Sequence, residues 1–187
     1  MTTTSRQDLI PLIAQHPFSA DLAASHLIQL TEGTALTQFA LGKYLAHEDE
    51  RAEFFCLVVK GIVALETGQA VDHAIAVQSL EPGEVLGWSW FVAPHRWGFD
   101  ARAIEEVQVL AFNAEYLRRL CENDHELGYQ MLNRVVQVTT ARLIATRRQL
   151  VENTRVLYNA DHLATTSNFG KQIVHYISGP ISILVCL

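Results

Sequence analysis

The chain has 187 residues, of which 49% are hydrophobic and 18% are charged, and its formal net charge is -6. This length and composition predict one folded domain with a sizeable core and exclude a disordered chain. The acidity counts against a general nucleic-acid surface, since phosphate binding depends on clustered Lys and Arg. One group of arginines alternates with apolar residues and is typical of a solvated helix face: Arg142, Arg147, Arg148 and Arg155.

The cysteines are few and far apart, at Cys56, Cys121 and Cys186. This spacing predicts neither a disulfide framework nor a zinc site. The first residues, Met-Thr-Thr-Thr-Ser-Arg-Gln-Asp, contain no apolar leader, and no apolar run in the sequence reaches membrane-spanning length. We therefore expect a cytoplasmic protein that does not interact with membranes.

Apolar residues at helical spacing predict two short helices within residues 7–30, separated by Pro17. From Thr34 the pattern changes to short β-type runs, each bounded by Gly, Pro, Asp or Glu. Eight strands are predicted, at 36–39, 43–46, 54–60, 62–66, 73–80, 84–87, 98–104 and 106–112. Strands at this spacing, joined by tight turns, fit a small sandwich, jelly roll or barrel.

Helical spacing returns after the last strand, where Asn113 is a predicted N-cap. Asp124 then begins a long helix that lacks Gly and Pro from Tyr129 to about Leu157. Its seam positions alternate between spacings of four and three: Leu132, Val136, Thr139, Leu143, Thr146, Leu150, Asn153 and Leu157. Such a helix exceeds what one small roll can cover, so we predict a homodimer seam; the alternative is a helix packed on its own β domain. A tail of unassigned structure, residues 158–187, ends in an apolar run.

The most informative stretch of the sequence is 80–90, which is rich in glycine and tryptophan. Pro82 and Gly83 form a turn pair, Gly87 interrupts an apolar strand, and Ser89 is a candidate cap of a short helical turn. A bend of this kind leading into a helix start presents free backbone N–H groups, which can hold an anion. The alternative is a buried β-turn whose tryptophans belong to the core.

Several stretches match one known module as they stand: His16-Pro17-Phe18, Gly42-Lys43-Tyr44-Leu45, 54–65, 80–87 and 107–112. Together with the order of helices and strands, they resemble the cyclic-nucleotide-binding domain, the sensor module of the catabolite activator protein and the Crp/Fnr regulators. The resemblance covers about residues 8–155. It implies an α+β, mainly β fold: a double-stranded β-helix or jelly-roll β-roll at about 32–112, flanked by N-terminal helices and by C-terminal helices at about 113–157.

In that family, a phosphate-binding cassette carries a Gly, a Glu that takes the ribose hydroxyl, and later an Arg that pairs with the cyclic phosphate. Matched residue by residue, Gly87 takes the place of the Gly and Trp88 that of the Glu, while Trp97 lies at or next to the Arg. Both charged ligands are missing, and an indole N–H cannot replace a guanidinium. The candidate ligand-binding residues of this degenerate cassette are Gly87, Trp88, Ser89, Trp90, Arg96, Trp97, Gly98 and Arg102. We expect Trp88 or Trp90 to fill part of the nucleotide cavity.

Arg96 and Arg102 are the candidate replacements for the missing arginine. A shift of one residue would bring Arg96 into the role. On a strand, Arg102 would share a face with Asp100, and the two would neutralise each other. A genuine receptor for cyclic AMP or cyclic GMP thus stays open as an alternative. The resemblance also implies that the cassette helix and the C-terminal helix contact each other, which predicts a coupling between 87–92 and 117–132.

Crp/Fnr regulators carry a helix-turn-helix domain after the long helix, whereas here about thirty residues remain, neither basic nor patterned as three helices. The chain therefore resembles a divergent, single-domain branch of the family, and we expect no direct DNA binding. A small jelly-roll enzyme is a second alternative, although the histidines are scattered and no nucleophile elbow, P-loop or dinucleotide motif is present. We predict a non-enzymatic regulatory domain without a cofactor, which binds a small-molecule ligand or a protein partner.

Overall fold

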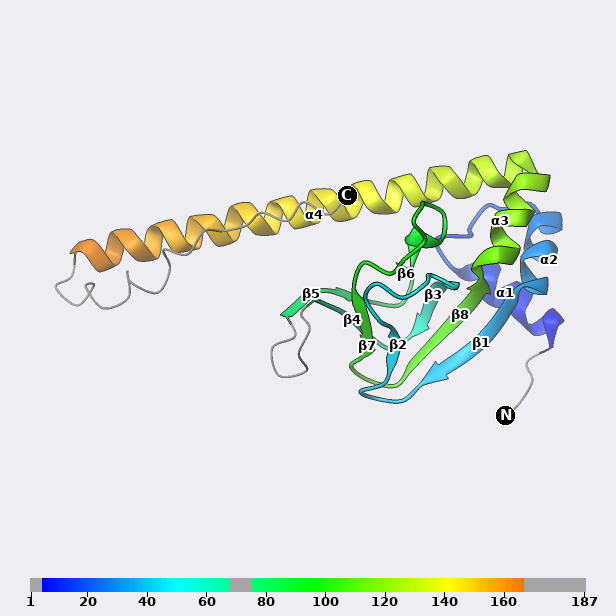
Figure 1. Ribbon diagram of the computed structural model, residues 1–187, viewed down its shortest axis with the longest axis horizontal. Helices are drawn as coiled ribbons and strands as arrows, with labels where there is room; N and C mark the ends of the chain where they lie inside the picture. Colours follow the sequence, from blue (N-terminus) through cyan, green and yellow to red (C-terminus); the bar gives the residue numbers. More distant parts are fainter. Residues whose placement is uncertain (1–4, 68–74, 167–187) are drawn as a thin grey trace. The chain divides into compact units, whose positions relative to one another are not determined.

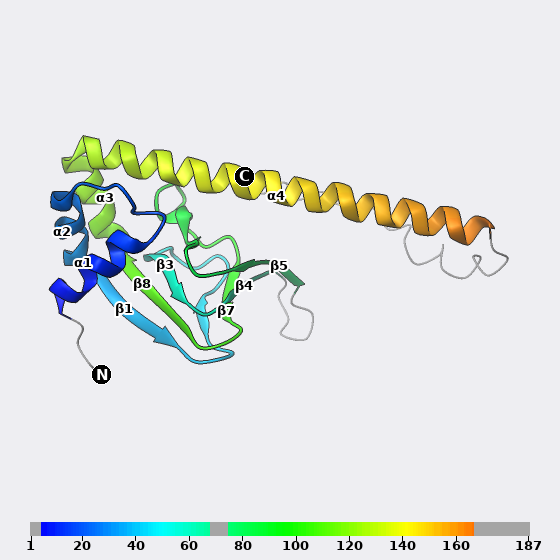
Figure 2. The same ribbon diagram turned by 180° about the vertical axis from the view of Figure 1, so that it is seen from behind.

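The protein is described by a computed structural model covering residues 5–67 and 75–166, with side chains described for 5–67 and 76–156. The chain divides into two compact units, one ending at Val136 and the other beginning at Gln137. The first unit contains the described strands and is drawn in Figures 1 and 2. The predicted domain extent of 8–155 stays a prediction.

Two short helices come first, α1 (Arg6–Gln15) and α2 (Ala24–Glu32), as the sequence predicted. Ser5 caps α1 reciprocally: its hydroxyl accepts from the Asp8 N–H (3.3 Å), and the Asp8 carboxylate accepts from the Ser5 N–H (3.2 Å). The apolar face of α1 buries Leu9 and Ile13, which anchor this helix in the first unit.

The eight predicted strands are confirmed, with small changes at their ends. They are β1 (Thr34–Phe39), β2 (Tyr44–Ala46), β3 (Phe54–Lys60), β4 (Val63–Thr67), β5 (Ile75–Leu80), β6 (Val85–Leu86), β7 (Asp100–Ala103) and β8 (Val107–Asn113). They form two four-stranded antiparallel sheets, in the orders β1-β8-β3-β6 and β2-β7-β4-β5. This order is that of a jelly roll, so the predicted α+β, mainly β fold is confirmed.

The core of the roll lies between the inner faces of the two sheets. It includes large aliphatic residues such as Val58, Leu65, Leu80 and Val109, together with the indole of Trp97. Strands alternate their side chains between two faces, which explains why Ala101 and Ala103 of β7 face this core and Asp100 and Arg102 do not. Several residues of the cluster are alanines, at 46, 52, 101 and 103.

The last strand leads directly into α3 (Ala114–Asn123) and then into α4 (His125–Thr166). Asn113 is the N-cap of α3, as predicted, because its Oδ1 accepts from the Tyr116 N–H (2.8 Å). Asp124 makes the equivalent bond at the start of α4, accepting from the Leu127 N–H (3.0 Å). A Cβ at Gly128 would lie 2.7 Å from the carbonyl oxygen of Cys121, so glycine permits the tight corner between the two helices.

The long helix α4 runs nine residues beyond its predicted end at Leu157. Its predicted seam residues Leu132, Val136, Leu143 and Leu150 are between 40% and 62% exposed within this single chain. The side chain of Leu157 and the apolar run at 181–187 lie outside the described residues. The homodimer stays a prediction.

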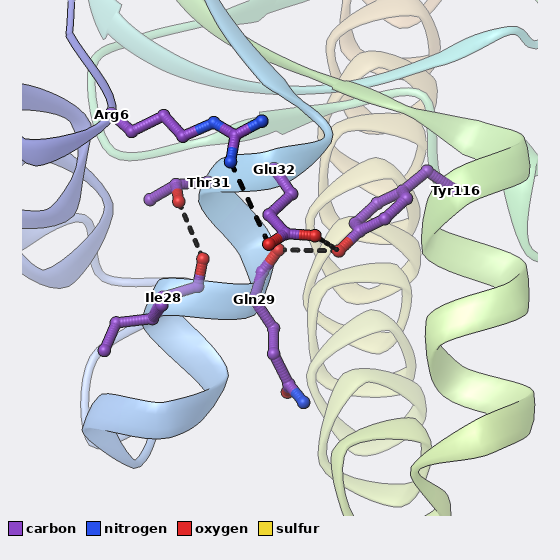
Figure 3. A network of polar contacts seen from close by, with 6 residues as sticks. All are labelled: Arg6, Ile28, Gln29, Thr31, Glu32 and Tyr116. Atoms are coloured by element: carbon purple, nitrogen blue, oxygen red, sulfur yellow. Dashed lines mark hydrogen bonds and ion pairs between the residues drawn. The ribbon is translucent and has the colours of Figure 1, made fainter.

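The helices α1, α2 and α3 gather beyond the end of the roll where β1 meets β8, as both ribbon views show (Figures 1 and 2). Tyr116 of α3 joins them: its hydroxyl donates to the carbonyl oxygen of Gln29 (2.9 Å) and lies 3.2 Å from the Glu32 carboxylate (Figure 3). Arg6 of α1 lies 3.9 Å from the same carboxylate. Burial and the Glu32 charge both raise the pKa of the Tyr116 phenol, so it stays protonated and can donate at neutral pH.

Candidate functional site

The cassette predicted from the sequence is a glycine turn followed by one turn of 3-10 helix. Gly87 adopts the left-handed conformation (φ 89°) and precedes the helix η2 (Trp88–Trp90). The tight turn into a helical segment is therefore confirmed. Ser89 lies in the middle of η2, and its predicted role as a cap is wrong: Gly87 occupies the N-cap position and no side chain bonds there.

The space against Gly87 is filled by Trp97. A Cβ added at Gly87 would lie 2.5 and 2.7 Å from Trp97 Cη2 and Cζ3, and 2.9 Å from the carbonyl oxygen of Phe54. Trp97 is 6% exposed and belongs to the core cluster of the roll. Its backbone is held on both sides, because its N–H donates to the Glu50 carbonyl (2.9 Å) and its carbonyl accepts from the Asp49 N–H (2.9 Å). The indole is thus fixed between the cassette glycine and the roll interior.

That Trp88 or Trp90 fills part of the nucleotide cavity stays a prediction, but neither is the residue that packs on Gly87. Trp90 is fully buried, but its ring packs on Phe91 at 4.9 Å and on Phe55 at 5.9 Å between ring centroids. Trp88 is only partly buried. The residue packed on the glycine is instead the tryptophan that the resemblance aligns at or next to the phosphate-pairing arginine.

The Trp90 end of the cassette is tied to α3. Arg118 Nη1 donates to the carbonyl oxygen of Trp90 (2.9 Å), so the final residue of η2 and the second turn of α3 are joined by a charge-assisted bond. The indole Nε1 of Trp90 is buried and has no hydrogen-bond partner among the described residues. These contacts agree with a mechanical link between the cassette and α3.

Arg102 lies on the face of β7 opposite the core and binds Glu66 of β4. Its Nε donates to Glu66 Oε2 (2.9 Å) and its Nη2 to Glu66 Oε1, a bidentate pair. This bonding raises the pKa of the guanidinium above its ordinary value. The predicted neutralisation by Asp100 is wrong, because Asp100 instead accepts from the Glu48 N–H (2.8 Å) and lies 3.2 Å from His47 Nδ1.

Arg96 is exposed and its Nη1 donates to the backbone carbonyl of Asp49. The neighbouring Gly98 has open space where a Cβ would stand, so no close approach requires a glycine there. Among the predicted site residues, the structure therefore brings Gly87 and Trp97 into contact. It directs Arg96 to the 47–53 connection and Arg102 to the outer face of the sheet.

Sequence reasoning missed two residues that organise the site. Glu66 carried a signal, since a carboxylate inside an apolar strand run requires a partner. Arg118 gave none, because its bond goes to a backbone carbonyl distant in sequence. His16, in the matching stretch His16-Pro17-Phe18, is 5% exposed, and burial lowers its pKa below the ordinary value.

Comparison with known proteins agrees with this architecture. Residues 36–124 match the family described as the cyclic nucleotide-binding domain. The search of curated proteins found no match. Among solved structures, a protein of Geobacter metallireducens GS-15 provisionally assigned to the cyclic nucleotide-binding proteins is 26% identical, with a TM-score of 0.64. The match covers 75% of this chain and 98% of the Geobacter chain.

Two further structures share the fold at lower identity. The sensor domain of the transcriptional regulator DNR from Pseudomonas aeruginosa is 19% identical (TM-score 0.56; 72% of this chain and 92% of that chain). The regulatory subunit of a cAMP-independent protein kinase A from Trypanosoma cruzi, bound to guanosine, is 24% identical (TM-score 0.55; 64% and 42%).

Residues 36–124 therefore match the cyclic nucleotide-binding domain family, and the fold is shared with sensor and regulatory domains. Within the described part of the chain, no helix is both long and apolar enough to cross a membrane. The described residues also contain no group of three or more His, Cys, Asp or Glu side chains arranged for a metal ion.

Proposed function

We propose that this protein is a non-enzymatic regulatory module whose cassette is closed by its own Trp97 and responds to a ligand or partner other than a cyclic nucleotide. The observation that carries the proposal is the packing of Trp97 against Gly87 at a position where the family resemblance expects the phosphate-pairing arginine. An indole there excludes the cyclic phosphate by volume. It also offers no positive charge to replace the guanidinium.

The two alternative arginines support this reading by the bonds that they already make. Moving Arg102 toward the cassette would break two bonds to Glu66, whose side chain is only 4% exposed, and would leave that carboxylate without its partner. Arg96 would have to leave the carbonyl of Asp49. Hydrogen bonds to charged groups contribute about 1.5–3 kcal/mol each, so a cassette without one binds a cyclic phosphate weakly.

The chemistry of the ligand follows from the tryptophans that stand where the family has a charged Glu and Arg. An apolar or aromatic group can displace the Trp97 indole from its place beside Gly87 in the apolar core, because the two compete for the same contacts. The Trypanosoma cruzi relative is bound to guanosine, a nucleoside without a phosphate. We therefore include nucleosides, as well as an aromatic side chain of a protein partner, among the ligands to be tested.

Two further parts of the proposal concern the oligomeric state and the cellular location of the protein. We propose a homodimer through the α4 seam, since its apolar side chains are exposed in the single chain and lie at coiled-coil spacing. The free thiols of Cys56 and Cys121 agree with a cytoplasmic location. Burial raises the pKa of Cys56 to about 12, so this thiol is unreactive and serves as a core residue.

Isothermal calorimetry with cyclic AMP, cyclic GMP and guanosine tests the proposal directly. We expect no cyclic nucleotide to bind more tightly than the high micromolar range. A submicromolar Kd would overturn the proposal in favour of the genuine receptor. Arg96→Ala and Arg102→Ala, measured in parallel, would then identify the arginine responsible.

A further inference from the structure

A cavity of about 270 Å³ lies between three segments next to the cassette. Its walls are residues 51–54 before and at the start of β3, residues 94–95 at the far end of the cassette, and Asn113, Glu115 and Arg118 at the start of α3. Trp97 does not line it, so this cavity is separate from the space that the indole fills. Nothing in the cassette proposal uses it.

Backbone hydrogen bonds hold the walls of the cavity in place. The Ala52 N–H donates to the carbonyl oxygen of His95 (2.8 Å), which joins the β2–β3 connection to the cassette. The Ala114 N–H donates to the carbonyl oxygen of Glu53 (2.9 Å), which joins the same connection to α3. Because the 51–54 segment is bonded to both other walls, the cavity is preformed, as small-molecule sites usually are.

The charges around the cavity balance each other without being paired. Arg51 and Arg118 contribute two positive charges, and Glu53 and Glu115 contribute two negative ones. None of the four forms an ion pair with another described residue. An inorganic anion would meet two carboxylates and a simple amine would meet two guanidiniums. A ligand that carries both charges can satisfy all four groups.

His95 lines the same cavity and is held there by its backbone. Its Nδ1 is buried and has no hydrogen-bond partner among the described residues. Its backbone is held in the left-handed conformation (φ 58°) by the bond from Ala52 and by its own N–H bond to Val92 (3.0 Å). These backbone bonds fix His95 as one wall of the cavity.

We propose that this cavity binds a small zwitterion, a free amino acid. The carboxylate of the ligand bonds Arg51 and Arg118, and its ammonium group bonds Glu53 and Glu115. The volume lies just below the range of roughly 300–1,000 Å³ typical of drug-sized ligands, which suits a metabolite of amino-acid size. Because Arg118 also bonds the Trp90 carbonyl, occupancy of the site is transmitted to the cassette.

The test is a screen of the individual standard L-amino acids against the full chain, by thermal shift and then by calorimetry. Acetate, methylamine and inorganic phosphate serve as probes that each carry one kind of charge. We expect at least one amino acid to bind and to change tryptophan fluorescence, and the three single-charge probes to bind at least about tenfold more weakly, a difference that calorimetry resolves.

Two variants place the ligand in this cavity. Arg51→Ala and Glu115→Gln should each weaken binding at least about tenfold, whereas Arg119→Ala and Glu122→Gln, exposed positions of α3 outside the cavity, should leave it unchanged. The proposal is overturned if no amino acid binds at millimolar concentration. It is also overturned if phosphate or methylamine binds as tightly, or if the two cavity variants bind as the wild type does.

Discussion

Replacing Trp97 with alanine tests whether the indole closes the cassette. Trp97 is 6% exposed, and a buried tryptophan removes roughly 150–250 Å² from water. At about 25 cal/mol per Å² this burial contributes roughly 4–6 kcal/mol, of which an alanine keeps a part. We expect Trp97→Ala to lower the free energy of unfolding by about 4 kcal/mol, within the observed range for such truncations. Urea denaturation followed by circular dichroism measures the loss.

The same variant should gain an affinity for a ligand shaped like the missing side chain. Removing the indole beside Gly87 would leave a cavity in the apolar core cluster, and such cavities bind aromatic molecules. Free indole at about one hundred times its Kd should restore about 2.7 kcal/mol of stability to Trp97→Ala. Trp88→Ala is the matched control, since Trp88 is only partly buried; it should lose less stability and gain nothing from indole.

Two results would refute the reasoning. A loss below about 1 kcal/mol would mean that the site collapses without cost and that Trp97 does not fill it. Equal stabilisation of both variants by indole would mean that indole binds elsewhere on the protein.

Three further predictions concern stability and assembly. Arg102→Ala should lower the free energy of unfolding by about 2 kcal/mol, less than the loss of a fully buried pair, because Arg102 is 35% exposed and water can reach the Glu66 carboxylate once the guanidinium is gone. Adding Glu66→Leu to the same chain should recover most of this loss in urea denaturation, and no recovery would contradict the pairing. Burial lowers the pKa of His16 below 6.5, so the folded state binds a proton at His16 less readily than the unfolded state, and stability should fall as the pH drops below about 6.5. Thermal unfolding of His16→Gln at several pH values should lack this part of the pH dependence, and an unchanged pH dependence would exclude His16 as its source. Leu143→Asp should convert a dimer to a monomer in sedimentation analysis, because it buries a charge in the seam. The control Ile144→Asp, off the seam, should leave the dimer intact. A wild-type protein that is monomeric at tens of micromolar would show that there is no seam.

The order of strands and helices could be predicted because each element has a local cause. Alternating apolar runs bounded by turn residues define strands, and Asn113 and Asp124 mark helix starts by their capping chemistry. The jelly-roll order itself came from the family resemblance, since short antiparallel strands of this spacing also fit a sandwich or a barrel.

The details of the site could not be predicted because they depend on contacts distant in sequence. Which tryptophan packs on Gly87 is decided by the 47–53 connection, which holds the Trp97 backbone through Asp49 and Glu50. The partner of Arg102 is decided by the register of β4 against β7, which brings Glu66 alongside. Local spacing favoured Asp100 as the partner of Arg102, but the Asp100 carboxylate instead contacts residues 47 and 48.

The contacts around Trp90 bear on how a cassette without charged ligands can still act. The Phe55 ring packs between those of Phe18 in the α1–α2 connection (4.9 Å) and Trp90 (5.9 Å), while Arg118 of α3 donates to the Trp90 carbonyl. Because Trp90 is fully buried, η2 cannot shift without moving these neighbours, as close-packed interiors transmit small displacements. We expect a ligand that displaces Trp97 from Gly87 to move η2, and with it α3. The loss of the Glu and Arg of the family would then change which ligand is sensed, while the contacts that connect η2 to α3 would remain.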